Sequence, residues 1–296
     1  MPEDGLEWTD RAQLLSFEEI ERVARLCVER LGVRSIRLTG GEPTVRADLT
    51  SLVGRLSPLV DDLALTTNGT RLRDLADPLA RAGLRRVNIS LDTLRPDRFL
   101  RMTRRDAFDS VLDGIRAAVA VGLDPVKINC VVVRGVNDDE VVDLVRFGRD
   151  VGATVRFIEF MPLDASGAWD RDAVVSLDEI VERVNGAFPV RPVVRGDAPA
   201  DRFRFVDGRG EFGVIPSVTN AFCDRCDRIR LSADGELRNC LFAVDGTDLR
   251  SLLRSGADDE ALELAIRSCV AAKWAGHGIG RVDFIRPPRS MSQIGG

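Results

Sequence analysis

Three cysteines near the end of the chain are the side chains best suited to chemistry. Two residues separate Cys223 from Cys226, and Cys240 follows beyond a turn. Thiolates at this spacing are typical ligands of Zn²⁺ or of an iron–sulfur cluster, whereas buried structural thiols and a redox pair are the alternatives. We therefore predict a metal site here, with zinc and an iron–sulfur cluster both open.

The number of sulfur ligands bears on which metal is bound. A structural zinc site uses four protein ligands, whereas a cluster held by three thiolates leaves one iron open to a small molecule. Cys269, His277 or a nearby aspartate could supply a fourth ligand.

Arginines surround these thiols, at positions 225, 228, 230 and 238. If Ile229 and Leu231 mark a strand, Arg228 and Arg230 project from its opposite face. Guanidinium groups are suited to phosphate, so we predict an anion site beside the metal site.

The turn between the cysteines poses a register problem. A two-residue hairpin turn at Asp234-Gly235 would place Cys240 opposite Ile229, on the face away from the arginines. A bulge or a longer loop must therefore intervene.

Composition limits the possible functions. The 296 residues are 44% hydrophobic and 30% charged with a net charge of −5, so no overall positive field favours nucleic acid. No apolar run approaches the roughly 20 residues of a membrane helix, and the first residues do not resemble a signal peptide. We expect a cytoplasmic protein with reduced thiols, in which Cys27 and Cys130 belong to the core.

Strands and helices alternate over the first 160 residues. A capping box at Ser16 and Glu19 opens the first helix, and Gly32 ends it. Short apolar strands are expected at residues 35–39, 63–67, 87–91, 126–133 and 155–160. Helices are expected between them at about 48–59, 72–82, 108–121 and 138–150. This order predicts a parallel sheet with helices outside, closed or nearly closed into a barrel.

The pattern changes after Pro162. A second capping box at Ser176 and Glu179 starts a helix, and a stretch rich in Pro and Arg up to Arg202 reads as a linker. Short strands at 202–206 and 211–215 and helices near 249 and at 258–271 follow. We expect one domain at residues 1–190 and a second at 191–296.

The carboxyl ends of barrel strands carry reactive groups. Gly40-Gly41 there allows a ligand close to the backbone, or simply forms a tight turn. Lys127 lies in an apolar strand, so its tip reaches solvent, meets an anion or forms a Schiff base. Met161 on general grounds is a core residue.

Together, several motifs in order resemble the MoaA family of radical S-adenosylmethionine enzymes, the GTP 3′,8-cyclases of molybdenum-cofactor biosynthesis. The resemblance runs essentially from end to end of the chain. Its motifs are Arg37-Leu-Thr-Gly-Gly-Glu-Pro43, Thr66-Thr-Asn-Gly69, Val87-Asn-Ile-Ser-Leu-Asp92, Lys127-Ile-Asn129, Phe157-Ile-Glu-Phe-Met-Pro162, the three-cysteine stretch and the Gly-Gly end.

The resemblance implies roles for individual residues. A [4Fe-4S] cluster whose open iron binds guanine would be held by Cys223, Cys226 and Cys240. GTP would be contacted by Arg37, Thr66, Lys127, Arg228 and Arg230. S-adenosylmethionine would be contacted by Gly41, Ser90 and Met161, and the tail Gly295-Gly296 would reach into the active site.

The resemblance also implies a lyase reaction. Reductive cleavage of S-adenosylmethionine, at a second [4Fe-4S] cluster, would give a deoxyadenosyl radical that takes hydrogen from the ribose C3′ of GTP, and that carbon would join guanine C8. The product is 3′,8-cyclo-7,8-dihydro-GTP. An electron donor and a downstream cyclic pyranopterin monophosphate synthase would be partners, and a homodimer is possible.

One part of the family pattern is not matched. The family barrel begins with a Cys-x-x-x-Cys-x-x-Cys loop followed by Met-Pro, and this sequence begins at Met1-Pro2. We therefore expect an incomplete (β/α)6 TIM-like barrel that lacks its first strand, with a C-terminal α+β cluster-binding region. A wrong start codon or a truncated gene would explain this, and the chain alone would then not start the reaction.

Two other functions stay open at this point. One is a non-catalytic, zinc- or cluster-stabilised module that binds a nucleotide through Arg228 and Arg230. The other is a Schiff-base lyase at Lys127, which leaves the cysteines unexplained.

Overall fold

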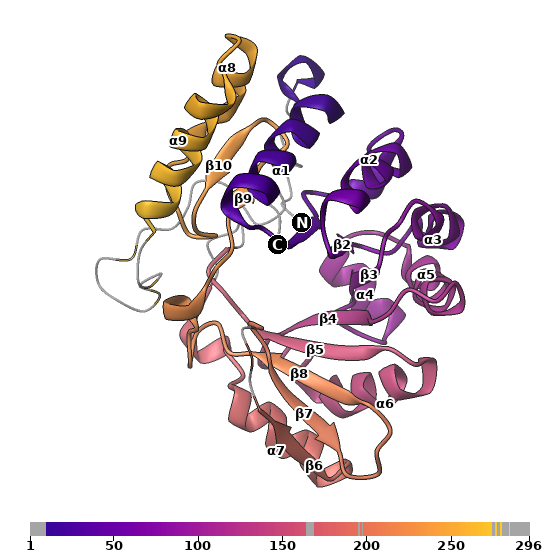
Figure 1. Ribbon diagram of the computed structural model, residues 1–296. Coiled ribbons are helices and arrows are strands. Elements are labelled where there is room, and N and C mark those ends of the chain that lie inside the picture. Colours follow the sequence, from indigo (N-terminus) through magenta and orange to yellow (C-terminus); the bar gives the residue numbers. More distant parts are fainter. Residues whose placement is uncertain are drawn as a thin grey trace.

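The computed structural model describes residues 10–163, 169–194, 196, 198–273, 276, 279 and 284 (Figure 1). Its first half consists of α1 (Phe17–Leu31), β1 (Ser35–Leu38), α2 (Leu49–Leu56), β2 (Asp62–Thr67), α3 (Leu72–Arg81), β3 (Arg86–Ser90), α4 (Pro96–Thr103), α5 (Phe108–Ala120), β4 (Val126–Val132), α6 (Val141–Val151) and β5 (Thr154–Glu159). The second half consists of α7 (Leu177–Ala187), β6 (Val190–Val193), β7 (Asp201–Phe205), β8 (Glu211–Ile215), β9 (Arg230–Leu231), β10 (Glu236–Arg238), β11 (Thr247–Asp248), α8 (Leu249–Arg254) and α9 (Asp259–Ala271).

The main sheet is curved and mostly parallel. It has 8 strands in the order β1-β2-β3-β4-β5-β8-β7-β6. Neighbours from β1 to β5, and β5 with β8, run parallel, while β7 and β6 are antiparallel additions. Helices α2, α3, α5 and α6 lie along the outer side of the arc (Figure 1). The predicted α/β fold is confirmed.

The sheet does not close on itself within the described residues. There, β1 pairs with β2 alone, and β6 pairs with β7 alone. The architecture is therefore a partial barrel. That a first strand is missing stays a prediction.

The two faces of the sheet differ in chemistry because side chains alternate along a strand. In β4, the side chains of Ile128 and Cys130 are fully buried against the outer helices. Lys127 and Asn129 point to the opposite face. We call this concave face, turned away from the helices, the inner face. It carries the polar residues of the barrel.

Both predicted capping boxes are confirmed. The Ser16 hydroxyl accepts from the Glu19 N–H at 3.2 Å, and the Glu19 carboxylate accepts from the Ser16 N–H at 2.7 Å. Ser176 and Glu179 repeat this arrangement at the start of α7. In the described part of the chain, no helix is long and apolar enough to span a membrane.

Two regions differ from the sequence predictions. The stretch predicted as a linker up to Arg202 contains the edge strand β6, where Pro192 is tolerated because an edge position needs fewer N–H donors. Residues 190–193 form a strand because they pair with β7. Local propensity cannot reveal such a pairing. Helix α4 was not predicted. The boundary between residues 190 and 191 stays a prediction, and one sheet continues across it.

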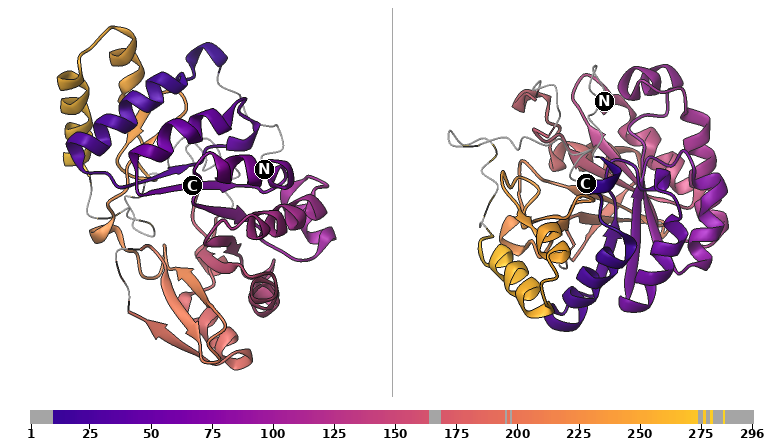
Figure 2. Two further views of the ribbon diagram at one scale, coloured as in Figure 1. Left: turned by 45° about the vertical axis from the view of Figure 1, so that its right-hand side comes forward. Right: turned by 90° about the horizontal axis from the view of Figure 1, so that it is seen from above.

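The C-terminal part packs beside α1. Strands β11, β10 and β9 form a small antiparallel sheet. Residues of β10, α8 and α9 pack together with residues of α1 in one apolar cluster. Figures 1 and 2 show α8 and α9 next to α1. The buried members of the cluster are Val23, Cys27, Leu237, Leu249, Ile266 and Cys269. This packing places the cysteine stretch next to the β1 end of the main sheet.

Candidate active site

Three cations from separate strands share the inner face. Arg37 lies on β1, Lys127 on β4 and Arg156 on β5. Burial lowers the pKa of Arg37 to about 10, with Arg86 and Arg228 adding to the effect. Burial and the charge of Arg156 lower the pKa of Lys127 to about 8. The pKa of Arg156 is lowered to about 10 by burial and by Arg37. The three positive charges therefore face one another at close range.

Carboxylates compensate these charges only in part, because Asp62 acts on Arg37 and Glu211 acts on Lys127 without an ion pair to either. Asp62 is bound by Arg86 through two bonds of 2.6 and 2.7 Å. Among the described residues, Arg37, Lys127 and Arg156 form no ion pair. Like charges without counter-ions are costly in a buried site, so this face is suited to a polyanion.

Unpaired polar atoms lie on the same face. In the described part of the chain, four buried side-chain atoms lack a hydrogen-bond partner, and three of them are Arg37 Nε, Asn88 Oδ1 and Asn129 Oδ1. Each such atom costs about 1–3 kcal/mol. Asn88 lies opposite Lys127, and Asn129 lies opposite Arg156. Asn88 also donates to the Thr66 hydroxyl at 3.0 Å, so Thr66 belongs to the same site.

The cysteine hairpin has the longer turn that the register problem requires. β9 and β10 pair with Leu231 opposite Leu237 and Arg230 opposite Arg238. The turn has a third residue, and Gly235 adopts a φ of 85° and donates its N–H to the Ser232 carbonyl at 3.0 Å. Continuing this register places Cys240 opposite position 228, on the side of the arginines. Of the two predicted alternatives, a bulge or a longer loop, the structure has the longer loop.

The hairpin arginines adjoin the inner face. Burial lowers the pKa of Arg230 to about 10, and the charges of Arg228 and Arg37 add to the effect. The thiols of Cys226 and Cys240 partly offset this lowering. Arg228 stacks its guanidinium 5.0 Å from the Phe222 ring centre. Because Arg228 affects the pKa of Arg37 and Arg37 affects the pKa of Arg230, the barrel and hairpin cations lie near enough to repel one another.

No disulfide joins the described cysteines, and the surroundings of Cys226 favour its thiolate form. Burial would raise the pKa of Cys226, but the Arg228 N–H and the charges of Arg228 and Lys273 bring it below its usual value. Arg228 Nε lies 3.4 Å and Lys273 Nζ 3.6 Å from the Cys226 sulfur. The Phe242 N–H lies 3.4 Å from the Cys240 sulfur. Electropositive donors around soft sulfur ligands fit an iron–sulfur cluster.

The structure does not assemble every proposed ligand. Within the described ranges, no group of three His, Cys, Asp or Glu side chains is arranged as a metal site. Cys269, considered as a fourth ligand, is 8% exposed, and its thiol donates to the Leu237 carbonyl at 3.6 Å. Burial raises the pKa of Cys27 to about 11 and that of Cys130 well above its usual value. These three cysteines form no ligand group with the hairpin thiols in the described part of the chain, and His277, Gly295 and Gly296 lie outside the described residues.

The residues expected to contact S-adenosylmethionine lie at the carboxyl edge of the sheet. Gly41 follows β1, Ser90 ends β3 and Met161 follows β5. Glu42 fixes the first of these loops, because its carboxylate accepts from the Thr67 hydroxyl and the Asn68 N–H, both at 2.6 Å. The edge thus presents three ordered positions.

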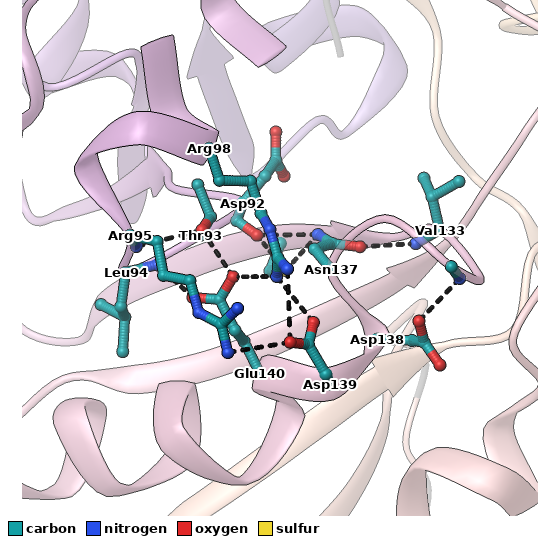
Figure 3. Close-up of polar contacts among 12 residues, drawn as sticks. Asp92, Thr93, Leu94, Arg95, Arg98, Val133, Asn137, Asp138, Asp139 and Glu140 are labelled. Carbon is teal, nitrogen blue, oxygen red and sulfur yellow. Dashed lines mark hydrogen bonds and ion pairs between the residues drawn. The ribbon is translucent and has the colours of Figure 1, made fainter. Parts of the chain in front are cut away.

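A polar network fixes the segment that follows Ser90 (Figure 3). Buried Glu140 accepts from the Thr93 hydroxyl and the Leu94 N–H, both at 2.6 Å, and from Arg98. Asn137 donates to the Asp92 carbonyl at 2.7 Å. These bonds tie the end of β3 to the loop between β4 and α6, which limits the movement of Ser90.

A third glutamate fixes the segment around Met161. Glu159 is 0% exposed, and its carboxylate accepts from the N–H groups of Leu177, Val218 and Thr219 at 3.1, 2.8 and 2.8 Å. It therefore joins the end of β5 to α7 and to the chain segment that leads into Cys223.

Sequence reasoning missed several of these residues. Arg156 carries the same signal as Lys127, a charge inside an apolar strand, and could have been found in that way. Asn88 and Asn129 lay within quoted motifs but carried no assigned role. Glu159 and Lys273 gave no local signal, because their partners are distant in sequence.

The partial parallel barrel, its polar carboxyl edge and the thiol site define a class, the radical S-adenosylmethionine proteins. The family model described as the Radical SAM superfamily matches residues 2–148, and the model described as Molybdenum Cofactor Synthesis C matches residues 153–279.

Curated relatives define the particular family. The chain is 48% identical over 303 residues to the GTP 3′,8-cyclase of Rhodopirellula baltica, covering 100% of this chain and 84% of that protein. It is 46% identical over 301 residues to the GTP 3′,8-cyclase of Streptomyces coelicolor, covering 100% and 88%. The chain belongs to the GTP 3′,8-cyclase family of radical S-adenosylmethionine lyases. A non-catalytic binding module is not favoured.

Proposed function

We propose that this chain binds GTP on the inner face of the barrel and that its function is the cyclisation of GTP to 3′,8-cyclo-7,8-dihydro-GTP, in molybdenum-cofactor biosynthesis. One observation carries the proposal. Among the described residues, the inner face gathers cations that form no ion pair and buried polar atoms that lack a hydrogen-bond partner. A nucleoside triphosphate supplies the negative charges and the hydrogen-bonding groups that such a surface lacks.

The cations act on the triphosphate. The residues proposed to contact GTP are Arg37, Thr66, Lys127, Arg228 and Arg230. We add Arg156 to this set, because its charge acts on Lys127 and Arg37 acts on it. Arg228 and Arg230 approach from the hairpin, whereas the other side chains approach from the sheet. Charge from both sides orients the nucleotide and fixes where its ribose lies.

The hairpin thiols are proposed to hold the nucleobase end through a cofactor. Cys223, Cys226 and Cys240 would hold a [4Fe-4S] cluster with one open iron, which binds guanine when present. Gly41, Ser90 and Met161 would bind S-adenosylmethionine, which with its own cluster supplies the radical chemistry. The proposal assigns one cluster to the described cysteines, because Cys27, Cys130 and Cys269 are buried in apolar clusters. None of the described cysteines is proposed as a ligand of the second cluster.

Further parts of the proposal concern partners and segments. An electron donor and a downstream cyclic pyranopterin monophosphate synthase are proposed partners, and a homodimer and a cytoplasmic location are proposed as well. The Gly295-Gly296 tail is proposed to reach the active site. Two domains, at residues 1–190 and 191–296, remain part of the proposal.

Anaerobic reconstitution with iron and sulfide tests the thiol site. We expect about three to four irons per chain, together with GTP binding, and loss of the iron in Cys223→Ser. Cys27→Ser is the matched control, because Cys27 lies in the apolar cluster and should leave the iron content unchanged. Stoichiometric zinc without iron, or no response to GTP, would refute the proposal.

A further inference from the structure

Lys273, just beyond α9, contacts the cysteine stretch from outside its motif. Its Nζ donates to the Arg228 carbonyl at 2.7 Å and lies 3.6 Å from the Cys226 sulfur. Lys273 is 47 residues from Cys226 in the sequence. One ammonium group thus reaches the backbone of a proposed GTP contact and a proposed cluster ligand.

The last turn of α9 is anchored where Lys273 leaves it. Ile266 and Cys269 are buried in the apolar cluster shared with α1. Asn239, directly before Cys240, donates its side-chain amide to the Cys269 carbonyl at 2.9 Å. The Cys269 thiol donates to the Leu237 carbonyl at 3.6 Å. The helix end that carries Lys273 is therefore held in place by apolar packing and hydrogen bonds.

The backbone that Lys273 holds lies between regular elements. A short 3-10 turn covers Cys223–Arg225, and β9 begins at Arg230. Within the turn, the Cys226 N–H donates to the Cys223 carbonyl at 3.2 Å. The bond from Lys273 to the Arg228 carbonyl links the segment between Cys226 and β9 to the end of α9. It therefore fixes the backbone position from which the Arg228 side chain extends.

We propose that Lys273 is a positioning residue of the thiol site: it fixes the backbone of Arg228, so that the guanidinium is aimed at the bound nucleotide, and it donates to the sulfur of Cys226. This inference rests on the proposed function. Donors and positive charge near a cluster sulfur stabilise the reduced cluster, which raises its reduction potential. A fixed Arg228 loses less conformational entropy when it binds phosphate.

Three variants test the proposal on the full-length protein. Lys273→Met removes the donor and the charge, whereas Lys273→Arg restores both. Arg267→Met is the matched control, because Arg267 also lies on α9, donates to the Arg30 carbonyl at 3.0 Å and bonds Glu263 away from the thiols. The readouts are the midpoint potential of the reconstituted cluster, GTP affinity by calorimetry and amide exchange of residues 226–230 in the apo-protein.

We expect Lys273→Met to keep its iron, shift the midpoint potential to more negative values, weaken GTP binding roughly threefold to tenfold and speed amide exchange at residues 226–230. Lys273→Arg should recover most of each change, and Arg267→Met should show none of them. A potential and a GTP affinity equal to wild type in Lys273→Met would overturn the proposal.

Failure of the proposed function gives a different result. Wild-type protein would then take up no iron or bind no GTP, whatever residue stands at position 273. Amide exchange in the apo-protein still decides the positioning role. Faster exchange at residues 226–230 in Lys273→Met alone supports it, and unchanged exchange refutes it.

Discussion

Two sets of charged side chains lie largely out of solvent contact in this barrel, and they differ in whether the chain supplies their partners. Glu140 and Glu159 are 1% and 0% exposed, and each carboxylate accepts hydrogen bonds from backbone N–H groups. Arg37, Lys127 and Arg156 lie on the inner face and, among the described residues, have no carboxylate in ion-pair contact. Burying a charge is costly in both cases, but only the glutamates have their partners within the chain.

The difference separates structural from functional charge. A buried carboxylate that is fully bonded holds loops together and needs nothing further. A buried cation without a counter-ion keeps its capacity for a ligand, and the unpaired Arg37 Nε marks the place. Substitutions should therefore act on stability at the glutamates and on ligand affinity at the cations.

The largest effect on folding is expected at Glu159. In Glu159→Gln, one carboxylate oxygen becomes an NH2 donor. Whichever way the amide turns, this donor opposes either the Leu177 N–H or the N–H groups of Val218 and Thr219, so bonds are lost. We expect the free energy of unfolding to fall by about 2–4 kcal/mol in urea titrations. Glu182→Gln, at an exposed position on the same helix as Leu177, is the control and should change little. Equal stability of the two variants would contradict a structural role.

Arg156→Met should show the opposite pattern. Removing an uncompensated cation relieves repulsion with Arg37, so stability should stay constant or rise. GTP affinity should fall roughly tenfold to a hundredfold, because a charge-assisted contact to phosphate is lost. Arg146→Met, which breaks a surface pair with Asp143, is the control for both measurements. A strong loss of stability with unchanged GTP affinity would place Arg156 among the structural charges.

A smaller effect is expected from pH at Lys127. Its pKa is about 8 in the folded protein, below the ordinary value of 10.5, so between these pH values the unfolded chain binds more protons. The contribution of Lys127 to stability should therefore rise from pH 8 to pH 10.5, so the rise should be smaller in Lys127→Met than in wild type. GTP favours the charged amine, so its affinity should fall above pH 8 in wild type. If wild type and Lys127→Met give parallel curves of stability against pH, the buried cation is not titrating as described.

Local signals predicted much of the fold. The two capping boxes and the alternating apolar strands are properties of short segments. The structure has helix starts at both capping boxes, as predicted. The turn beside Gly235 followed from strand geometry, because a two-residue turn would have put Cys240 on the wrong face. What failed depends on distant partners. β6 is a strand because β7 pairs with it, although its own residues Pro192 and Arg191 argue for a loop.

The candidate site divides in the same way. Motifs pointed to Lys127 and to the cysteines, and burial in the structure added Arg156. The hydrogen-bond partners of Glu159 and Lys273 lie 18 or more positions away in the sequence, so no short window contains both partners. The geometry of the fold is needed to bring these pairs together.

Comparing GTP with GMP tests the central claim most directly. The two ligands share the base and the ribose, so the difference in their affinities reports on the phosphates that the inner-face cations would meet. The account predicts that wild type binds GTP roughly a hundredfold more tightly than GMP by calorimetry, with an advantage that shrinks as salt is added and in Arg156→Met. Equal affinities of wild type for GTP and GMP at low salt would contradict it.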